Sequence, residues 1–183
     1  FVSFFPQLIQ GPISFYDQLA HQLYAERNFS YKNLKHGTLL MLWGYFKKMV
    51  IADRAVSLIQ MVAPDYMQYN GTVIFITVLV YALQLYADFS GGIDISRGFA
   101  EILGIEMAEN FCRPYFAVSI NDYWRRWHIT LGAWMKNYVF YSLAMSKRFF
   151  KMGKNLKQKY GDHAVGAHIA KVLPAGIASF ITF

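Results

Sequence analysis

Charged residues and cysteine are scarce in this sequence, and each shortage argues against a class of protein. Only 16% of the 183 residues are charged, whereas soluble domains average about 25%. Hydrophobic residues make up 55% and the mean hydropathy is +0.22, which argues against an ordinary soluble domain. The charges are still too frequent for a bundle of purely lipid-facing helices. The composition predicts a polytopic membrane protein with a polar interior and with interfacial or re-entrant pieces.

Cysteine occurs only as Cys112, which excludes an internal disulfide and is expected to fill a small apolar space. No spacing of Cys, His, Asp and Glu predicts a metal site. The sequence also lacks a phosphate-binding glycine loop and any nucleic-acid module. We therefore assign the formal charge of +7 to the excess of basic residues on the cytosolic side of membrane proteins. Membrane lipid is expected as a partner, with no nucleic acid and no bound cofactor.

An initiator methionine and a signal-like basic segment are absent as well. The sequence begins at Phe1 and stops within the apolar run 176–183. No internal repeat or low-complexity linker divides it. We expect residues 1–183 to form a single partial domain, an internal piece of a longer membrane protein.

Hydrophobic patterning predicts an all-α chain. The clearest membrane span is 72–87, which at 1.5 Å per residue covers about 24 Å of the roughly 30 Å hydrocarbon core. The other expected elements are a broken or re-entrant segment over 1–13, an interfacial helix over 15–31, helices over 38–51 and 94–103, a turn over 110–115, a helix over 121–144 and a span over 164–183 broken by Pro174.

Basic residues are expected at the membrane surface. Lys47 and Lys48 close an apolar helix, and we interpret them as side chains that reach back to the lipid head groups. Residues 147–159 carry six basic residues and no acidic one. This run predicts a cytoplasmic loop that faces anionic lipid.

Residues 121–131, Asn-Asp-Tyr-Trp-Arg-Arg-Trp-His-Ile-Thr-Leu, are the most informative stretch of the sequence. Asn121 is a plausible N-cap for the helix that follows. On that helix Trp124 lies above His128 and beside Trp127, because residues three and four apart share a face. A histidine walled by indoles lies in a partly dry place that suits proton transfer.

Two arginines add positive charge to the same stretch. Asp122 is within reach of Arg125 or Arg126 on one helix face, and an anionic substrate group would be attracted there. An interfacial helix, with tryptophans and arginines at the head-group level, explains the same residues without any chemistry. The spacing alone leaves both interpretations open.

Two aspartates beside a glycine pair form a second polar cluster. Asp88 ends the predicted span, Gly91-Gly92 predicts a break in the helix, and Asp94 precedes Arg97 by one turn. We favour a structural ion-pair cluster that fixes the helix break over direct catalysis, because buried ionic groups often fix the register of packed elements.

Four motifs occur in one order along the sequence. They are Phe4-Phe5-Pro6-Gln7-Leu8-Ile9-Gln10-Gly11-Pro12-Ile13, Tyr86-Ala87-Asp88-Phe89-Ser90-Gly91, Asn110-Phe111 with Pro114-Tyr115, and Trp124-Arg125-Arg126-Trp127-His128-Ile129. With these motifs the sequence resembles the membrane-bound O-acyltransferase (MBOAT) family, in particular the branch of alginate O-acetyltransferases and teichoic-acid D-alanyl transfer proteins. After Ser90-Gly91 this branch commonly has Tyr-Ser-Asp, where the present sequence has Gly92-Ile93-Asp94.

The resemblance implies a multi-helix fold in the inner cell membrane, with a tunnel between the cytosolic and outer faces. It implies O-acetyl transfer from a cytosolic thioester such as acetyl-CoA to a hydroxyl of an extracytoplasmic polysaccharide, alginate among them, or of an acyl-accepting partner. D-alanyl transfer to teichoic acid and a non-enzymatic channel or transport subunit are the alternatives.

The resemblance also assigns roles to residues. His128 would be catalytic, by proton relay or by hydrogen-bonding the thioester carbonyl. The substrate-binding residues would be Trp124, Arg125, Arg126 and Trp127, and the structural tunnel residues would be Asp88, Asp94 and Asn110. The two arginines would either hold the helix through Asp88, Asp94 or Asp122 or attract an anionic donor. The two tryptophans would exclude water and shape the tunnel.

One family feature is missing. The principal catalytic histidine of the family stands in a Trp-His-Gly context and would act as the general base on the acceptor hydroxyl. None of the other histidines, His21, His36, His163 and His168, has that context. We expect them to be solvent or interface residues, and the principal histidine to lie outside this sequence.

Overall fold

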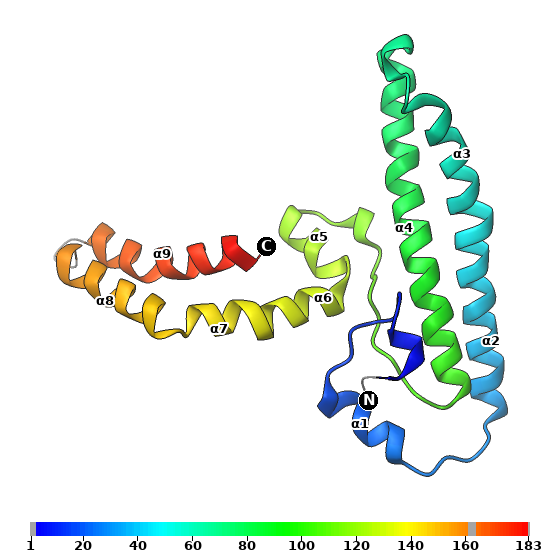
Figure 1. Cartoon of the computed structure of the whole chain (residues 1–183), viewed down its shortest axis with the longest axis horizontal. Helices are drawn as coiled ribbons and strands as arrows, with labels where there is room; N and C mark the ends of the chain where they lie inside the picture. Colours follow the sequence, from blue (N-terminus) through cyan, green and yellow to red (C-terminus); the bar gives the residue numbers. More distant parts are fainter. Residues whose placement is uncertain (1–2, 161–163, 183) are drawn as a thin grey trace. The chain divides into compact units, whose positions relative to one another are not determined.

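The computed structural model describes residues 3–160 and 164–182, and the regular structure in these ranges is helical (Figure 1). The prediction of an all-α chain is confirmed. The chain divides into two compact units, Phe1–Thr130 and Leu131–Phe183. The single partial domain that the sequence suggests stays a prediction.

Two long helical rods form the body of the first unit, and they lie side by side (Figure 1). The first rod runs without a break from Tyr31 to Val62 through α2, η2 and α3, and the second rod is α4. The elements of this unit are η1 (Phe5–Gln7), α1 (Tyr16–Tyr24), α2 (Tyr31–Tyr45), the π-helical η2 (Phe46–Ala52), α3 (Asp53–Val62), η3 (Tyr66–Gln68), α4 (Gly71–Ile102), η4 (Pro114–Phe116) and α5 (Ile120–Arg126).

α4 begins at a capped turn and runs for 32 residues. The Asn70 side chain accepts a hydrogen bond from the Val73 backbone N–H at 3.0 Å, which satisfies one of the free donors at the start of the helix. Among the described residues, α4 is the one helix long and apolar enough to cross a membrane. Its first half presents exposed apolar side chains such as Phe75 and Leu79. The span predicted over 72–87 is confirmed as part of this candidate.

The predicted break at Gly91-Gly92 is wrong, and so is a separate helix starting at Asp94, because α4 passes through both without interruption. Gly91 packs against α2 of the first rod, where an added Cβ would lie 2.8 Å from the Gly44 carbonyl oxygen. Gly98 meets Gly37 in the same way, at 2.5 Å. These glycines let two helix backbones touch, and the close packing keeps α4 helical where glycine alone would weaken it.

The first rod also differs from the prediction. α1 ends at Tyr24, short of the helix expected over 15–31, and the helix expected over 38–51 is the middle of a rod that runs from Tyr31 to Val62. Ser30 caps this rod by accepting a hydrogen bond from the Asn33 backbone N–H. The segment before α1 is broken by turns around Pro6, as one of the two alternatives for 1–13 predicts, and a re-entrant path stays a prediction. Residues 1–2 lie outside the described ranges.

A segment with little regular structure follows α4 and leads towards α5. Its first part is held by burial, since Ile105 and Met107 pack with Leu19 of α1 and Ala100 of α4. Pro114 begins a single 3₁₀ turn, which confirms the turn predicted there. This packing fixes the path of the chain on its way to Asn110.

The second unit contains a helical hairpin, in which α8 and α9 pack on each other (Figure 1). The loop predicted over 147–159 is wrong, because its basic residues alternate with apolar ones at helical spacing and form α8. α9 continues through Pro174, where a break was predicted, and its apolar part is Val172–Thr182. The elements are α6 (Ile129–Trp134), which starts before the division, η5 (Met135–Phe140, π-helical), α7 (Tyr141–Ala144), α8 (Lys147–Tyr160) and α9 (Ala164–Thr182).

Candidate functional site

His128 lies at a break between two short helices, and not within a long one. α5 is capped by Ser119, whose hydroxyl accepts from the Asp122 backbone N–H at 3.1 Å, so the expected cap at Asn121 is wrong. The helix ends at Arg126, and the chain turns through His128 with φ of 46° before α6 begins. The left-handed region is uncommon for residues other than glycine, and a residue held there costs about 1–3 kcal/mol.

A short antiparallel pairing holds this turn in place. Phe111 faces Trp127 in an isolated bridge. The Cys112 N–H donates to the Arg126 carbonyl and the Ile129 N–H donates to the Asn110 carbonyl, both at 3.0 Å. The backbone on either side of His128 is therefore tied to the segment that follows α4. This pairing is the local reason why the helix expected to run on to residue 144 stops short.

The Asn110 side chain is the centre of the site. It is 1% exposed. Its Oδ1 accepts from the Thr130 backbone N–H at 2.9 Å, from the Thr130 hydroxyl at 2.8 Å and from His128 Nδ1 at 3.2 Å. The Thr130 hydroxyl in turn accepts from the Ile13 backbone N–H at 3.1 Å. Through these contacts the first and third sequence motifs meet at the histidine.

Phenyl rings, and not indoles, surround the imidazole. Phe89 of α4 meets His128 edge to face at 4.7 Å between ring centroids, and Phe111 lies at 6.4 Å. Burial among these rings lowers the pKa of His128 from its ordinary value of 6.5. The imidazole is therefore neutral near pH 7.

The two tryptophans lie beside this pocket rather than over the histidine. Trp127 stacks on Tyr123 at 5.8 Å and meets Phe111 edge to face at 4.9 Å. Trp124 is 62% exposed and contacts Tyr123. The predicted wall of indoles around His128 is wrong, because the chain leaves the helix before His128 can lie one turn above Trp124.

The predicted local ion pair is confirmed with the second arginine. Arg126 Nε lies 2.9 Å from Asp122 Oδ1, and the Val118 backbone N–H donates to the same carboxylate. The hydrogen bond from Arg126 is the main reason that the pKa of Asp122 lies below its ordinary value. Arg125 is exposed. Cys112 is exposed as well, and not the buried filler that was expected.

Asp88 and Asp94 find their partners on the other rod. Lys47 Nζ lies 2.7 Å from Asp94 Oδ2 and 2.9 Å from the Ser90 hydroxyl. Lys48 Nζ lies 2.5 Å from Asp88 Oδ1. Both lysines belong to the π-helical η2, whose wider turn brings consecutive side chains towards α4. The prediction that these lysines reach to the head groups is wrong, because carboxylates on the neighbouring helix are closer.

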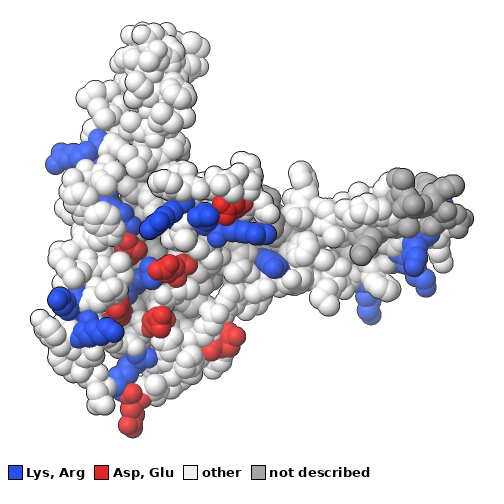
Figure 2. Space-filling model, turned by 180° about the vertical axis from the view of Figure 1, so that it is seen from behind, with Lys and Arg blue, Asp and Glu red and all other residues white. Residues whose placement is uncertain are grey.

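The ion pairs continue towards Asn110. Arg97 contacts Asp94 at 3.8 Å, as its spacing predicts, and Glu109 at 3.3 Å. Figure 2 shows basic and acidic side chains close together on one part of the first unit. On the same face, the tip where η3 connects α3 to α4 shows no charged atoms. The Arg97–Glu109 pair anchors the residue before Asn110 to α4.

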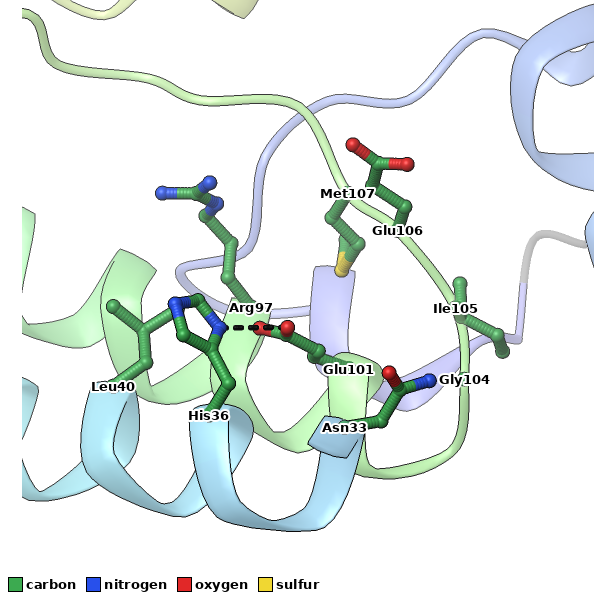
Figure 3. Close-up of a pocket in the computed structure, with 9 residues that line it drawn as sticks. All are labelled: Asn33, His36, Leu40, Arg97, Glu101, Gly104, Ile105, Glu106 and Met107. Carbon is green, nitrogen blue, oxygen red and sulfur yellow. Dashed lines mark hydrogen bonds and ion pairs between the residues drawn. The ribbon is translucent and has the colours of Figure 1, made fainter. Parts of the chain in front are cut away.

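A separate cavity of about 280 Å³ lies where α2, α4 and the segment after α4 meet. Figure 3 shows the His36 ring directed at the Glu101 carboxylate, from which it is 2.6 Å away. The His36 side chain is 67% exposed, and His21 and His168 are exposed too. These three histidines lie at the surface, as predicted, and His163 lies outside the described residues.

Several residues of the site are not among the site residues that the sequence predicts. Phe89 belongs to the motif around Asp88 and Thr130 follows His128 by two residues, so their positions in the motifs are the available signal. Phe111 is predicted only as part of a motif. The capping role of Ser119 was open to prediction, because Ser is a preferred N-cap and Asp122 follows it three residues later.

Known proteins resemble this chain over most of its length. A family model for the membrane-bound O-acyltransferase family matches residues 1–156. The chain is 39% identical over 145 residues to a peptidoglycan O-acetyltransferase of Helicobacter pylori, which covers 78% of this chain and 28% of the relative. It is 35% identical over 143 residues to a probable alginate O-acetylase of Pseudomonas aeruginosa, covering 78% and 27%.

A third relative has a different named activity. The teichoic acid D-alanyltransferase of Bacillus subtilis is 29% identical over 144 residues, which cover 76% of this chain and 36% of the relative. The chain thus spans about a third or less of the length of each of these three relatives.

Proposed function

The chain belongs to the membrane-bound O-acyltransferase family, and from that premise we propose that the complete protein transfers an acyl group, in the first place acetyl, from a thioester to a hydroxyl. The acceptor is an extracytoplasmic polysaccharide or a partner that accepts the acyl group. The two O-acetyl relatives, at 39% and 35% identity, support acetyl over D-alanyl, for which the identity is 29%. α4 is the candidate span in a multi-pass protein of the inner cell membrane, with re-entrant and interfacial helices beside it.

The environment of His128 is the observation that carries this proposal. It is a half-buried imidazole, neutral near pH 7, held by Asn110 and flanked by aromatic rings. Such a group moves protons at working pH and works best where water is kept away. The proton of the acceptor hydroxyl is removed with the help of a second histidine outside this chain. His128 assists by proton relay or by a hydrogen bond to the thioester carbonyl.

The neighbouring side chains take different parts in the proposal. Arg125 and Trp124 are exposed and contact the thioester donor, such as acetyl-CoA, through its negative charge and its apolar arm. Arg126 is held by Asp122 and stiffens the end of α5. Trp127 packs on Phe111 and keeps water from the imidazole.

D-alanyl transfer to teichoic acid is the second candidate, since two D-alanyltransferases are among the relatives. The two activities differ in donor and acceptor. Membranes that contain the complete protein are supplied in turn with labelled acetyl-CoA and with a D-alanyl thioester on a carrier protein. Label that reaches polymer from acetyl-CoA alone supports the acetyl proposal, and label from the D-alanyl thioester alone contradicts it.

Substitution of His128 tests the site. In the complete protein, His128→Ala should lower acyl transfer by roughly 10²–10⁴-fold while the amount in the membrane stays near normal. His128→Gln keeps size and one hydrogen-bond donor but cannot relay a proton. His36→Gln is the matched control, because His36 is exposed and outside the site. Near-normal activity of both His128 variants would overturn the assignment.

A further inference from the structure

The orientation of the Asn110 amide is fixed by one neighbour. The Thr130 backbone N–H can only donate, so the side-chain atom of Asn110 that faces it at 2.9 Å must be the oxygen. The same oxygen lies 3.2 Å from His128 Nδ1. An amide oxygen only accepts hydrogen bonds, and Nδ1 must therefore carry the proton of this contact.

A neutral imidazole carries one N–H. If that N–H is on Nδ1, Nε2 holds a lone pair and can accept a proton but cannot donate one. We infer that Asn110 is a positioning residue that selects the Nδ1–H form of His128, so that Nε2 receives the proton released by the acceptor hydroxyl and does not donate to the thioester carbonyl. This inference rests on the proposed acyl transfer and decides between the two roles left open for His128.

Asn110 is well placed to enforce this choice because it cannot move easily. It is buried, it takes three hydrogen bonds on one oxygen, and its backbone carbonyl accepts from the Ile129 N–H. The residue before it is held to α4 by the Arg97–Glu109 pair. A half-turn of the imidazole about its Cβ–Cγ bond would place Cδ2, in place of Nδ1, against the Asn110 oxygen. The Phe89 ring, at 4.7 Å between centroids, opposes this rotation.

The resulting proton path balances. The acceptor oxygen forms its bond to the thioester carbon as its proton passes, with the help of the second histidine of the proposed function, to Nε2. His128 becomes an imidazolium that keeps Nδ1–H on Asn110. The carbon–sulfur bond then breaks, and the leaving sulfur takes the proton from Nε2. An ester and a free thiol result, and the neutral Nδ1–H form of His128 is restored.

Among the described residues, the side chains found in contact with the imidazole carry no charge. They are Phe89 on α4 and Asn110 and Phe111 on the segment that follows it. The charged residues next to them in sequence or across the pairing are each held in an ion pair: Asp88 with Lys48, Glu109 with Arg97, and Arg126 with Asp122. A charge introduced at position 110 would therefore be the first in direct contact with the ring from the described part of the chain.

The tautomer is measured directly by nitrogen NMR. The complete protein is labelled with ¹⁵N-histidine in detergent at a pH where His128 is neutral, and the spectrum of His128→Gln identifies the signals that belong to this ring. We expect a protonated Nδ1 and an unprotonated Nε2, and a mixture of both forms in Asn110→Ala. A protonated Nε2 in the unsubstituted protein would overturn the inference.

A pH profile gives the second readout. Asn110→Asp places a carboxylate against Nδ1–H, which favours the imidazolium, so the midpoint of the acid limb of activity should rise by about one pH unit or more. Thr130→Val is the matched control, because it removes a hydroxyl bonded to Asn110 but keeps the backbone donor. It should lower the amount of folded protein and leave the midpoint unchanged. An unmoved midpoint in Asn110→Asp, or an equal shift in Thr130→Val, would count against the inference.

The two proposals fail in different ways. If His128 can be replaced without loss of transfer, the proposed function of this site falls. If His128 is required but its neutral form carries the proton on Nε2, the acyl-transfer proposal stands and only the role of Asn110 falls.

Discussion

Lys47 Nζ lies 2.7 Å from Asp94 Oδ2, and this pair joins η2 to the middle of α4. The two side chains are 9% and 15% exposed, so both charges are largely removed from solvent. The Ser90 hydroxyl accepts a further hydrogen bond from Lys47. Breaking a buried pair on one side leaves the other charge uncompensated, which costs more than the pair itself contributes.

Lys47→Met should destabilise the complete protein by about 3–5 kcal/mol, because Asp94 would keep only its contact with Arg97 at 3.8 Å. Monodisperse protein recovered in detergent, and its thermal midpoint, measure the effect. The double variant with Asp94→Leu should recover much of the loss, since no charge is then left unpaired. Lys48→Met should cost about 1 kcal/mol or less, because its pair with Asp88 is more exposed. Equal losses for the two lysines would contradict this ranking.

Gly98→Ala should prevent α2 and α4 from packing, because the new methyl group would lie 2.5 Å from the Gly37 carbonyl oxygen. A backbone atom cannot move aside as a flexible side chain can, so the helices must separate. Gly71→Ala is the control, since nothing lies within 4 Å of its added Cβ and alanine favours the helix. We expect little folded protein for the first variant and a normal or slightly higher amount for the second, by fluorescence-detected size exclusion.

Acyl transfer should fall as the pH is lowered, with a midpoint below 6.5. The active form of His128 is neutral, and protonation occupies the lone pair of Nε2. Burial lowers the pKa of His128 from 6.5, so activity is retained to a lower pH than an exposed histidine would allow. The rate at saturating donor, measured across pH, checks this. A midpoint above 6.5 that disappears in His128→Gln would show that the imidazole is stabilised in its charged form.

The basic helix α8 should face the cytosol, because cytosolic segments of membrane proteins carry the excess of lysine and arginine. A Lys154→Cys variant, in a background from which Cys112 and any further cysteine of the complete protein are removed, should react with a membrane-impermeant maleimide only after the cells are permeabilised. The background change matters because Cys112 is itself exposed. Labelling of position 154 in intact cells would place α8 on the outer side.

The sequence alone determined the features that depend on neighbours along the chain. The apolar run 72–87 predicted the candidate span, because length and apolar composition alone identify such a helix, without any knowledge of its contacts. The Asp122–Arg126 pair follows from four-residue spacing on a helix. The order of the four motifs indicates the family, which the match over residues 1–156 confirms, whereas the roles that the resemblance implies for His128 and Asn110 stay predictions.

The tertiary structure decided everything that depends on which segments meet. By itself, Gly91-Gly92 predicts a helix break, and only the structure shows that Gly91 packs against Gly44. By itself, Lys47 is interpreted as a surface lysine, and only the structure shows Asp94, 47 residues later in the sequence, at 2.7 Å. The rings beside His128 belong to Phe89 and Phe111, and the oxygen that contacts its Nδ1 belongs to Asn110. Helix formation is driven by local hydrogen bonds and apolar spacing, which a sequence displays. The partner of a buried charge or ring is set by packing between distant segments, which local spacing does not encode.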